Sequence, residues 1–342
     1  MYKLFEYARM IADQGRTQAY AESLRRCVTP SSVVVDIGTG TGVFALLAAR
    51  LGARKVYAID PSDAIQFGRR IAAENGLDRR IEFIQGVSTQ IQLPEKADVI
   101  VAEIHGILPA HQRSLNSLMD ARDRFLTAGG CLIPRRETLW AALVEATALH
   151  EQTVGVWGRD IFGIDMTAIV STAANTWHKS RLQPQNLVTG PQCWATLDYA
   201  VLRSPHVRGT AAWEIRERRT AHGIAVWFDW DGADGVAFSN SPLSGERHIF
   251  GQAFFPWPEP LELRQEDEVR LELRSDAVGS EYVYGWETIV RGKDGRTKAA
   301  LQQSDFFGRV WSADRLRQLS STVPPTPTEA AASVRESSRY SE

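Results

Sequence analysis

Residues 33–42 read VVVDIGTGTG, and residues 55–60 read KVYAID. In the first stretch, a run of β-branched residues ends near an acidic residue, Asp36, and leads into a glycine-rich turn. This pattern is typical of a buried strand, a tight turn and the start of a helix. The second stretch indicates the next strand and ends on another carboxylate, Asp60. Together they predict the nucleotide-binding edge of a parallel sheet, where glycines let the backbone approach the ligand and the second acid binds ribose hydroxyls.

The bulk composition is that of an ordinary globular protein with room for two domains. The chain has 342 residues, of which 44% are hydrophobic and 23% charged, and its formal net charge is −2. This charge gives no overall attraction to nucleic acid or to an anionic membrane. No apolar run approaches the roughly 20 residues of a membrane span, and the N-terminal stretch does not resemble a signal peptide. We therefore expect a cytoplasmic protein with no membrane or nucleic-acid partner.

The three cysteines are Cys27, Cys131 and Cys193. They lie far apart and show no CxxC spacing typical of metal or redox sites. In a cytoplasmic protein we expect them to be reduced, structural thiols. No other spacing of histidines and acids indicates a metal site, so none is predicted.

The pattern of the chain changes near Pro134. Between residues 32 and 134 strands and helices alternate, which predicts an α/β domain with a Rossmann-like parallel sheet. Residues 1–31 indicate one or two helices ahead of the first strand. Over 135–318 apolar and polar residues alternate in runs separated by turns, which predicts antiparallel β structure closed as a barrel or a sandwich. Residues 319–342 are rich in Ser, Pro, Thr and Glu and are predicted to be a disordered tail.

The spacing of the glycines distinguishes three classes of nucleotide. A Walker loop requires GxxxxGK[ST], and no lysine follows this glycine run. A dinucleotide fingerprint is GxGxxG, whereas Gly38, Gly40 and Gly42 follow GxGxG. With Asp36 ahead of the glycines and Asp60 about 18 residues after them, the pattern favours S-adenosylmethionine over NAD. This cofactor has no pyrophosphate to neutralise, but it needs a carboxylate for its ribose.

The segments that flank this motif resemble the protein arginine methyltransferases. Residues 10–20, MIADQGRTQAY, resemble the family's MxxDxxRTxxY helix, and residues 2–5 resemble a remnant of its YxxF element. The stretch AEIHGILPAHQRSLNSLMDARDRFLTAGG resembles the catalytic hairpin and the helix after it, and DIFGIDMTAI resembles the start of the dimerisation arm. The resemblance, to a divergent bacterial-type member, implies a class I methyltransferase fold followed by a β-barrel with an inserted helical arm near residues 160–190. It also implies a homodimer, with S-adenosylhomocysteine as a product.

The resemblance assigns cofactor-binding roles to residues of the N-terminal half. Arg16 would bind the cofactor's carboxylate, Asp60 would take the place of the family's ribose glutamate, and Glu103 would lie between cofactor and acceptor. The remaining positions are those of the methionine pocket (Asp36, Gly38, Gly40, Gly42), of the adenine and amino-group contacts (Ser88, Thr89) and of the acceptor side (Tyr2, Met10). At Ser88 and Thr89 the family usually has a glutamate, so this sequence departs from its pattern there.

The acceptor hairpin departs further. The family grips the guanidinium with two glutamates on one hairpin; here Glu103 fills the first position, and the second falls on Gln112. Glutamine still accepts a hydrogen bond but brings no charge, and charge-assisted bonds contribute about 1.5–3 kcal/mol against about 1 for neutral ones. His105 stands where the family often has methionine. Because histidine titrates near neutral pH, His105 is a candidate general base; as an alternative, it and His111 are polar loop residues without a chemical role.

A second departure concerns the family's Thr-His-Trp loop. The corresponding stretch is GERHIFGQ, residues 245–252. An ungapped match from Gln252 places Ile249 and Phe250 at the histidine and tryptophan positions, whereas one inserted residue makes His248 the active-site histidine. The sequence leaves both alignments open.

Three functions follow from these observations. The first is an S-adenosylmethionine-dependent N-methyltransferase that acts on the guanidino group of arginine in a peptide, a protein or the free amino acid. The second keeps enzyme and cofactor but transfers the methyl group to an imidazole, amine, amide or hydroxyl, for which two carboxylates are not needed. The third is a cofactor-binding, dimeric pseudoenzyme. The sequence does not determine the acceptor atom or the number of methyl groups transferred.

Overall fold

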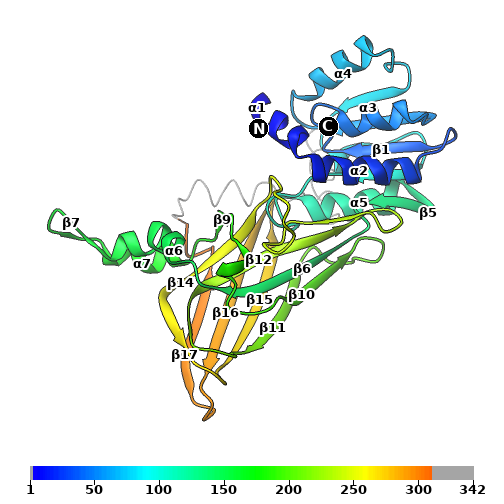
Figure 1. The fold of residues 1–342 in the computed structure, drawn as a ribbon. Helices are drawn as coiled ribbons and strands as arrows, with labels where there is room; N and C mark the ends of the chain where they lie inside the picture. The colour runs from blue at the N-terminus through cyan, green and yellow to red at the C-terminus, as the bar shows by residue number, and fades with distance from the viewer. Residues whose placement is uncertain (1–2, 310–342) are drawn as a thin grey trace, which may run out of the picture.

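The computed structural model of the chain describes residues 3–309. It contains a parallel α/β domain, an antiparallel β domain and an arm that projects from the latter (Figure 1). Tyr2 and the predicted tail, residues 319–342, lie outside the described residues. Within the part of the chain that is described, no helix is long and apolar enough to cross a membrane.

Two helices precede the parallel sheet, as the sequence predicted. They are α1 (Leu4–Ala12) and α2 (Gln14–Cys27). Asp13 separates them, because its backbone is extended and its carboxylate accepts a hydrogen bond from the Arg16 amide at 3.2 Å. A side-chain acceptor at this position satisfies a free amide of the first turn, so α2 starts here rather than continuing α1.

The α/β domain has a five-stranded sheet with the order β3-β2-β1-β4-β5, and all its neighbouring strands are parallel. The predicted parallel sheet is therefore confirmed. The strand order reverses direction between β1 and β4, and at such a point the carboxyl ends of the strands open a crevice for a ligand. The elements are β1 (Val33–Ile37), α3 (Val43–Arg50), β2 (Lys55–Asp60), α4 (Ile65–Glu74), β3 (Ile81–Gln85), the 3-10 turn η1 (Ser88–Gln90), β4 (Ala97–Ala102), α5 (Ser114–Phe125) and β5 (Leu126–Ile133).

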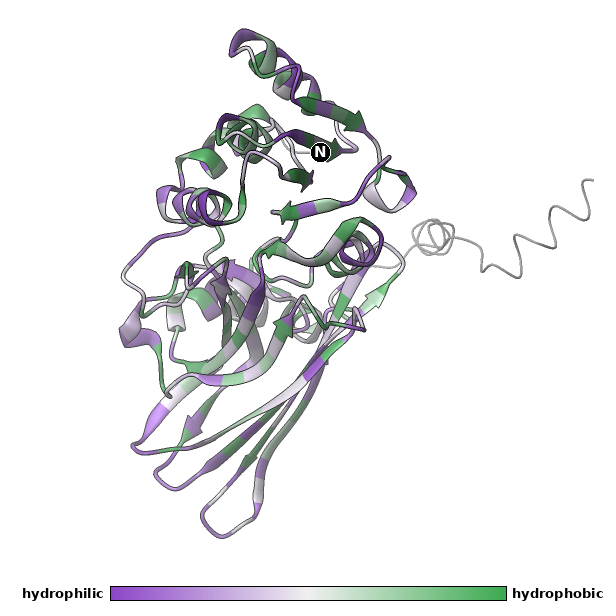
Figure 2. Cartoon of the chain, turned by 90° about the vertical axis from the view of Figure 1, so that its right-hand side faces the viewer, coloured by the Kyte–Doolittle hydropathy of each residue, from purple (hydrophilic) through white to green (hydrophobic). Residues whose placement is uncertain are grey.

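The second domain consists of antiparallel sheets, one of six strands and one of four. Hydrophilic and hydrophobic residues alternate along its long strands (Figure 2), which gives each sheet one buried face. The buried faces pack together: Phe255 and Trp286, one from each sheet, have ring centroids 4.9 Å apart. The first sheet contains β6 (Arg136–Val144), β9 (His178–Ser180), β10 (Gln192–Asp198), β12 (Arg219–Asp231), β13 (Ala237–Ser239) and β14 (Gln252–Leu263); the second contains β11 (Val207–Glu214), β15 (Glu268–Val278), β16 (Glu281–Arg291) and β17 (Thr297–Ser304).

The arm lies between β6 and β10 and projects away from the sheets (Figure 1). Its tip is the short hairpin of β7 (Asp160–Ile161) and β8 (Ile164–Asp165), with Phe162 fully exposed at the turn. The other elements of this segment are α6 (Thr147–Thr153), η2 (Gly155–Gly158), η3 (Thr167–Ile169), α7 (Val170–Ala174) and η4 (Pro184–Asn186).

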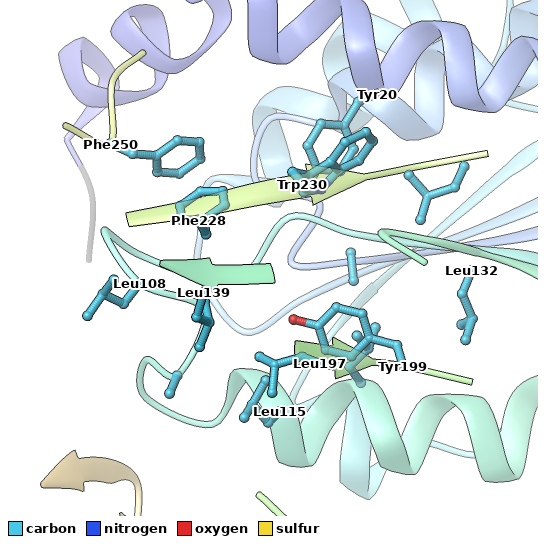
Figure 3. Close-up of a cluster of buried hydrophobic side chains, with 14 of the residues drawn as sticks. Tyr20, Leu108, Leu115, Leu132, Leu139, Leu197, Tyr199, Phe228, Trp230 and Phe250 are labelled. Carbon is cyan, nitrogen blue, oxygen red and sulfur yellow. The ribbon is translucent and has the colours of Figure 1, made fainter. Parts of the chain in front are cut away.

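A buried aromatic cluster joins the two domains (Figure 3). Tyr20 of α2 stacks on Phe44 of α3 at 4.8 Å and packs against Trp230 of β12 at 4.7 Å between ring centroids. The Trp230 indole donates a hydrogen bond to the Tyr20 hydroxyl at 3.1 Å. Helix α2 therefore contacts both the α/β domain and the antiparallel domain, and it positions the residues it carries relative to both.

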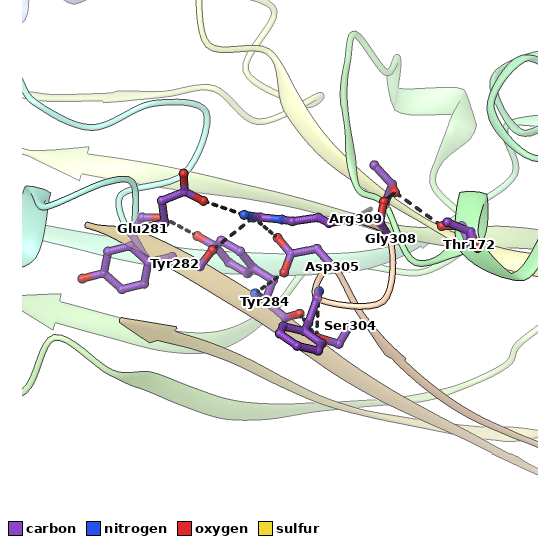
Figure 4. Close-up of polar contacts among 11 residues, drawn as sticks. Thr172, Glu281, Tyr282, Tyr284, Ser304, Asp305, Gly308 and Arg309 are labelled. Atoms are coloured by element: carbon purple, nitrogen blue, oxygen red, sulfur yellow. Dashed lines mark hydrogen bonds and ion pairs between the residues drawn. The ribbon is translucent and has the colours of Figure 1, made fainter. Parts of the chain in front are cut away.

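The last described residues lie against the start of β16 (Figure 4). Arg309 forms ion pairs with Glu281 at 2.5 Å and with Asp305 at 3.2 Å, and Asp305 accepts a hydrogen bond from the Tyr284 amide. The Tyr284 hydroxyl in turn donates to the Ala110 carbonyl at 2.8 Å. Since Ala110 belongs to the segment between β4 and α5, this hydrogen bond fixes that segment to strand β16.

The prediction of reduced cysteines is wrong for two of the three. Cys27, the last residue of α2, and Cys131 in β5 form a disulfide across 104 residues of sequence. Packing of α2 against β5 brings their Cα atoms to 6.3 Å, within the usual range for a disulfide. Only Cys193 is a free thiol among the described residues, and it is exposed.

Candidate active site

The glycine turn after β1 has the geometry that the sequence indicated. Gly38 and Gly40 have φ angles of 72° and 53°, in the left-handed region that glycine adopts without strain. Both also lie against other groups: a Cβ on Gly38 would be 2.3 Å from Ile104, and one on Gly40 would be 2.6 Å from the Tyr7 ring. The turn thus leaves no room for side chains, and Tyr7 of α1 covers it.

Asp36 lies beneath the turn and is 1% exposed. Its carboxylate accepts hydrogen bonds from the Thr39 hydroxyl at 2.6 Å and from the Ala45 amide at 2.9 Å. These bonds hold the turn against the start of α3. Burial raises the pKa of Asp36 to about 7, although both hydrogen bonds act in the opposite direction.

Asp60 ends β2 beside the same turn, at the carboxyl edge of the sheet. One oxygen accepts from the Gly40 amide at 2.8 Å, and the other accepts from the amide and hydroxyl of Ser62 at 2.7 and 2.6 Å. Ser88 and Thr89 lie in η1, which follows β3, the next strand of the sheet. Ser88 is buried, and Thr89 is exposed. The residues predicted to bind the methyl donor therefore lie at or just after the carboxyl ends of three neighbouring strands, β1, β2 and β3.

Arg16 enters this region from α2 and is 3% exposed. Its Nη2 donates to the Met10 carbonyl at 2.8 Å, and its Nη1 lies 3.2 Å from Glu103 Oε2. Its Nε is buried and has no hydrogen-bond acceptor among residues 3–309. A buried guanidinium nitrogen without an acceptor is costly. Arg16 thus offers a donor that an anionic group of a ligand would satisfy, which fits the carboxylate of S-adenosylmethionine.

Glu103 follows β4 and begins the segment that leads to α5. Burial raises its pKa, while the positive charges of Arg16 and His105 act to lower it. Gln112, at the far end of the segment, is exposed and has a φ of 48°, in the left-handed region. The two positions predicted to hold the acceptor therefore differ in charge and in exposure.

His248 lies against the N-terminal helices. Its Nδ1 is 3.1 Å from Asp13 Oδ1 in a hydrogen bond, and its Nε2 is 3.2 Å from Glu246. Asp13 also accepts from the Ile249 amide at 2.6 Å, so one carboxylate caps α2 and holds the loop of residues 245–252. Burial acts to raise the pKa of Asp13, but these hydrogen bonds, led by that from His248, lower it. The assignment of His248 as the active-site histidine stays a prediction.

His105 contacts a residue that the sequence analysis did not single out. Its Nε2 lies 3.1 Å from Oε1 of Glu137, near the start of β6, and the two side chains are 4% and 0% exposed. The Tyr199 hydroxyl donates to the other oxygen of Glu137. The pKa of His111, by contrast, is lowered by burial and by the charge of His105. Glu137 lies in the polar start of β6, between Arg136 and Thr138, so no local signal in the sequence distinguished it.

Two family models match consecutive parts of the chain. Residues 14–135 match a model described as ribosomal protein L11 methyltransferase, and residues 135–280 match one described as arginine methyltransferase oligomerization subdomain. The first is a methyltransferase model that covers the α2 helix and the parallel sheet. The second covers the arm and most of the antiparallel strands.

Curated relatives carry arginine methyltransferase names. The probable protein arginine N-methyltransferase 6 of Arabidopsis thaliana is 29% identical over 249 residues, which span 70% of this chain and 57% of that protein. Protein arginine N-methyltransferase 1 of Dictyostelium discoideum is 28% identical over 247 residues, which span 70% of this chain and 72% of that protein. The first match thus leaves over two fifths of the plant protein outside the aligned region.

Solved structures share the fold over almost their whole length. The Trypanosoma brucei PRMT1 enzyme-prozyme heterotetrameric complex with AdoHcy has a TM-score of 0.79 at 22% identity and covers 87% of this chain and 97% of its own. Arabidopsis thaliana protein arginine methyltransferase 10 has a TM-score of 0.76 at 21% identity and covers 88% and 97%. Together with the relatives and the oligomerization subdomain, this agreement confirms the resemblance seen in the sequence. The chain is thus similar in sequence and in fold to the protein arginine N-methyltransferases.

Proposed function

We propose that the protein is an S-adenosylmethionine-dependent N-methyltransferase that methylates a guanidino nitrogen of arginine in a peptide, a protein or the free amino acid. The ion pair between Arg16 and Glu103 carries this proposal. This ion pair connects α2, which carries Arg16 into the donor pocket, with the acceptor hairpin after β4, which carries Glu103. A residue pair of this kind fixes the two halves of a transfer site relative to each other.

The donor pocket suits S-adenosylmethionine, which supplies an electrophilic methyl group when bound and leaves as S-adenosylhomocysteine. In our proposal, Arg16 binds the carboxylate through its unpaired Nε. Asp60 takes the ribose hydroxyls. Asp36 and the glycine turn (Gly38, Gly40, Gly42) form the methionine pocket, and Ser88 and Thr89 lie at the adenine end.

The acceptor side needs a group that makes a guanidinium reactive. An arginine side chain is protonated at neutral pH and its nitrogen lone pairs are delocalised. Glu103 binds the guanidinium, localises its charge and receives the proton that the methylated nitrogen releases. Its raised pKa suits this last step. Gln112 accepts a second hydrogen bond, and Met10 of α1 borders the acceptor site; Tyr2 stays a prediction for the acceptor side.

His248 and Asp13 have a positioning role in the same site. Their hydrogen bond joins the loop of residues 245–252 to the start of α2, three residues before Arg16. The loop is therefore joined directly to the start of α2. We propose that His248 keeps Arg16 and Met10 in place over the donor.

A non-arginine acceptor is the second candidate, and Gln112 is the observation that favours it. A neutral amine or hydroxyl would not need two carboxylates, but it would need a base. His105 is poorly suited to that role, because Glu137 and the Gly106 carbonyl already occupy its two ring nitrogens. A pseudoenzyme would not need Arg16, Asp60 and Glu103 together, and their joint presence supports an active enzyme.

Methyl transfer from a labelled cofactor tests the proposal. Arginine, arginine peptides, histidine peptides and small amines are the acceptors, and mass spectrometry locates the label. Methylated guanidine supports the proposal, whereas a label on another atom favours the second candidate. Donor binding without product on any acceptor would favour a pseudoenzyme.

We also propose that the protein is a homodimer formed through the arm. Ile161, Phe162 and Ile164 at its tip are 37%, 100% and 58% exposed. Apolar side chains grouped on a projecting element mark a contact surface. The matching oligomerization subdomain supports this assembly. The predicted cytoplasmic location stays a prediction; the Cys27–Cys131 disulfide makes it testable, because cytosolic thiols would reduce that bond.

A further inference from the structure

A buried ion pair lies beside the acceptor hairpin and has no part in the donor pocket. His105 is two residues from Glu103, and Glu137 reaches it from β6 at 3.1 Å. Both side chains are buried from solvent. Taking two charges out of water is costly, and removing one partner from such a pair leaves an uncompensated buried charge. A buried pair with this desolvation cost therefore points to a role in the site beyond stability.

The His105 ring is held on every side. Phe250 stacks on it with centroids 5.1 Å apart at 29°, and Phe228 meets it edge-on at 5.1 Å. The Gly106 carbonyl lies 3.2 Å from Nδ1, on the side opposite to Glu137. A ring fixed in this way has no free nitrogen with which to abstract a proton.

The charges around the ring balance only if His105 is protonated. Arg16 and His105 are the cations, and Glu103 and Glu137 the anions. A neutral imidazole has a single N–H and could donate either to Glu137 or to the Gly106 carbonyl, whereas the protonated ring donates to both. Burial alone would lower the pKa of His105, but Glu137 above all and Glu103 raise it to about 9. Among the other titratable groups nearby is His111, and the positive charge of His105, together with burial, lowers its pKa.

We propose that His105 and Glu137 form a positioning pair for the acceptor hairpin. Glu137 fixes His105, and His105 fixes the segment that carries Glu103 and places a permanent positive charge beside it. The pair thereby keeps Glu103 ionised and aimed at the acceptor, in a hairpin that lacks the second glutamate. This inference rests on the proposed function, and it excludes His105 as a general base.

Glu137→Gln in the full-length chain tests the pair without removing its shape. The amide retains an acceptor for Tyr199 but no longer stabilises a charge on His105. The ¹³C-histidine NMR signal of His105, assigned by its loss in His105→Asn, should titrate near pH 9 in the wild type. In Glu137→Gln its midpoint should fall to about 6.5 or below, the ordinary range of histidine. This measurement requires neither cofactor nor turnover.

The kinetic counterpart is the pH profile. The wild type should show no ionisation of His105 in kcat/KM between about pH 6 and 8. Glu137→Gln should add one in this range, lower kcat/KM for the acceptor about tenfold at pH 8, where His105 is neutral, and change the donor Kd less than about twofold.

Asp267→Asn is the matched control. Asp267 is a buried carboxylate of the same domain and pairs with Lys298 at 2.6 Å, away from the hairpin. This variant should lose stability without a new ionisation. If Glu137→Gln does not fold, Tyr199→Phe removes one donor to Glu137, leaves more negative charge facing His105 and should raise the His105 midpoint above that of the wild type.

Three results would overturn the inference. They are a wild-type His105 midpoint near neutral pH, a midpoint unchanged by Glu137→Gln, and a loss of activity in Glu137→Gln that is independent of pH and equal to that of Asp267→Asn. Absence of methyl transfer by the wild type contradicts the proposed function instead, since the NMR titration reports on the pair by itself.

Discussion

At the scale of single residues, the charge at position 112 distinguishes this acceptor hairpin. Gln112→Glu restores a second carboxylate without changing side-chain length, and the left-handed backbone there tolerates both residues equally. A charge-assisted bond exceeds a neutral one by about 1 kcal/mol, so kcat/KM for arginine peptides should rise about fivefold. Initial rates with labelled donor measure this. Gln192→Glu, which adds the same charge on exposed β10, should have no effect; unchanged turnover in Gln112→Glu would contradict a weakened two-carboxylate clamp.

Asp36 gives a second prediction at this scale, on stability and pH. Its pKa is about 7 in the folded chain and 3.8 ordinarily. The folded state therefore binds a proton more tightly between these values, and the stability from this group, complete below pH 3.8, is lost as pH rises through 7. Relative to Asp36→Asn, the wild type should lose up to about 3 kcal/mol of unfolding free energy between pH 5 and 8.

Urea unfolding of the ligand-free protein at both pH values measures this difference. In Asp36→Asn, the side-chain amide oxygen can still accept from Thr39 and Ala45, so the fold is preserved. An equal pH dependence in both proteins would show that Asp36 is already ionised at pH 5. Because the donor carries a positive charge, Asp36→Asn should also weaken its binding at pH 8.

At the scale of elements, helix α2 is the part on which the site depends. It is capped by Asp13 at one end, tied by Cys27 to β5 at the other, and carries Arg16 between them. The disulfide closes a loop of 104 residues, for which the chain-entropy estimate is roughly 4–5 kcal/mol. Reduction, or Cys27→Ser, should therefore lower the melting temperature by several degrees. Cys193→Ser, at the exposed free thiol, is the control, and equal melting with and without reductant would show that the bond does not form in solution.

At the scale of the whole molecule, the arm predicts the state of assembly. Phe162→Glu together with Ile164→Glu places charges on the exposed tip, and a charge cannot be buried in an apolar contact without a large cost. We expect the wild type to be a dimer by light scattering and this variant to be a monomer with native circular dichroism. Val201→Glu, at an equally exposed position after β10, should remain a dimer. A monomeric wild type would contradict the proposed assembly.

The donor half of the molecule was largely predictable from sequence. Glycines with positive φ, a buried strand and a strand-terminal acid are local requirements, so Asp36, Gly38, Gly40 and Asp60 lie at the predicted sheet edge. Neighbouring parallel strands bring their carboxyl ends together whatever the rest of the chain does. The same reasoning predicted the antiparallel strands from their alternation, closed as a barrel or a sandwich, but not which strands would join the sheet of six and which the sheet of four.

The acceptor side could not be predicted in this way, because its contacts join residues that are distant in sequence. Glu137 meets His105 across 32 positions, His248 meets Asp13 across 235, and Cys27 meets Cys131 across 104. No local pattern encodes such pairs, since each depends on how the two domains pack around α2 and the hairpin. The sequence by itself determined the parallel sheet and the glycine turn after its first strand, because these backbone conformations follow from short-range patterns. The tertiary structure alone decided which charges surround Glu103, because burial and long-range packing determine whether a histidine beside it is a base or a fixed cation.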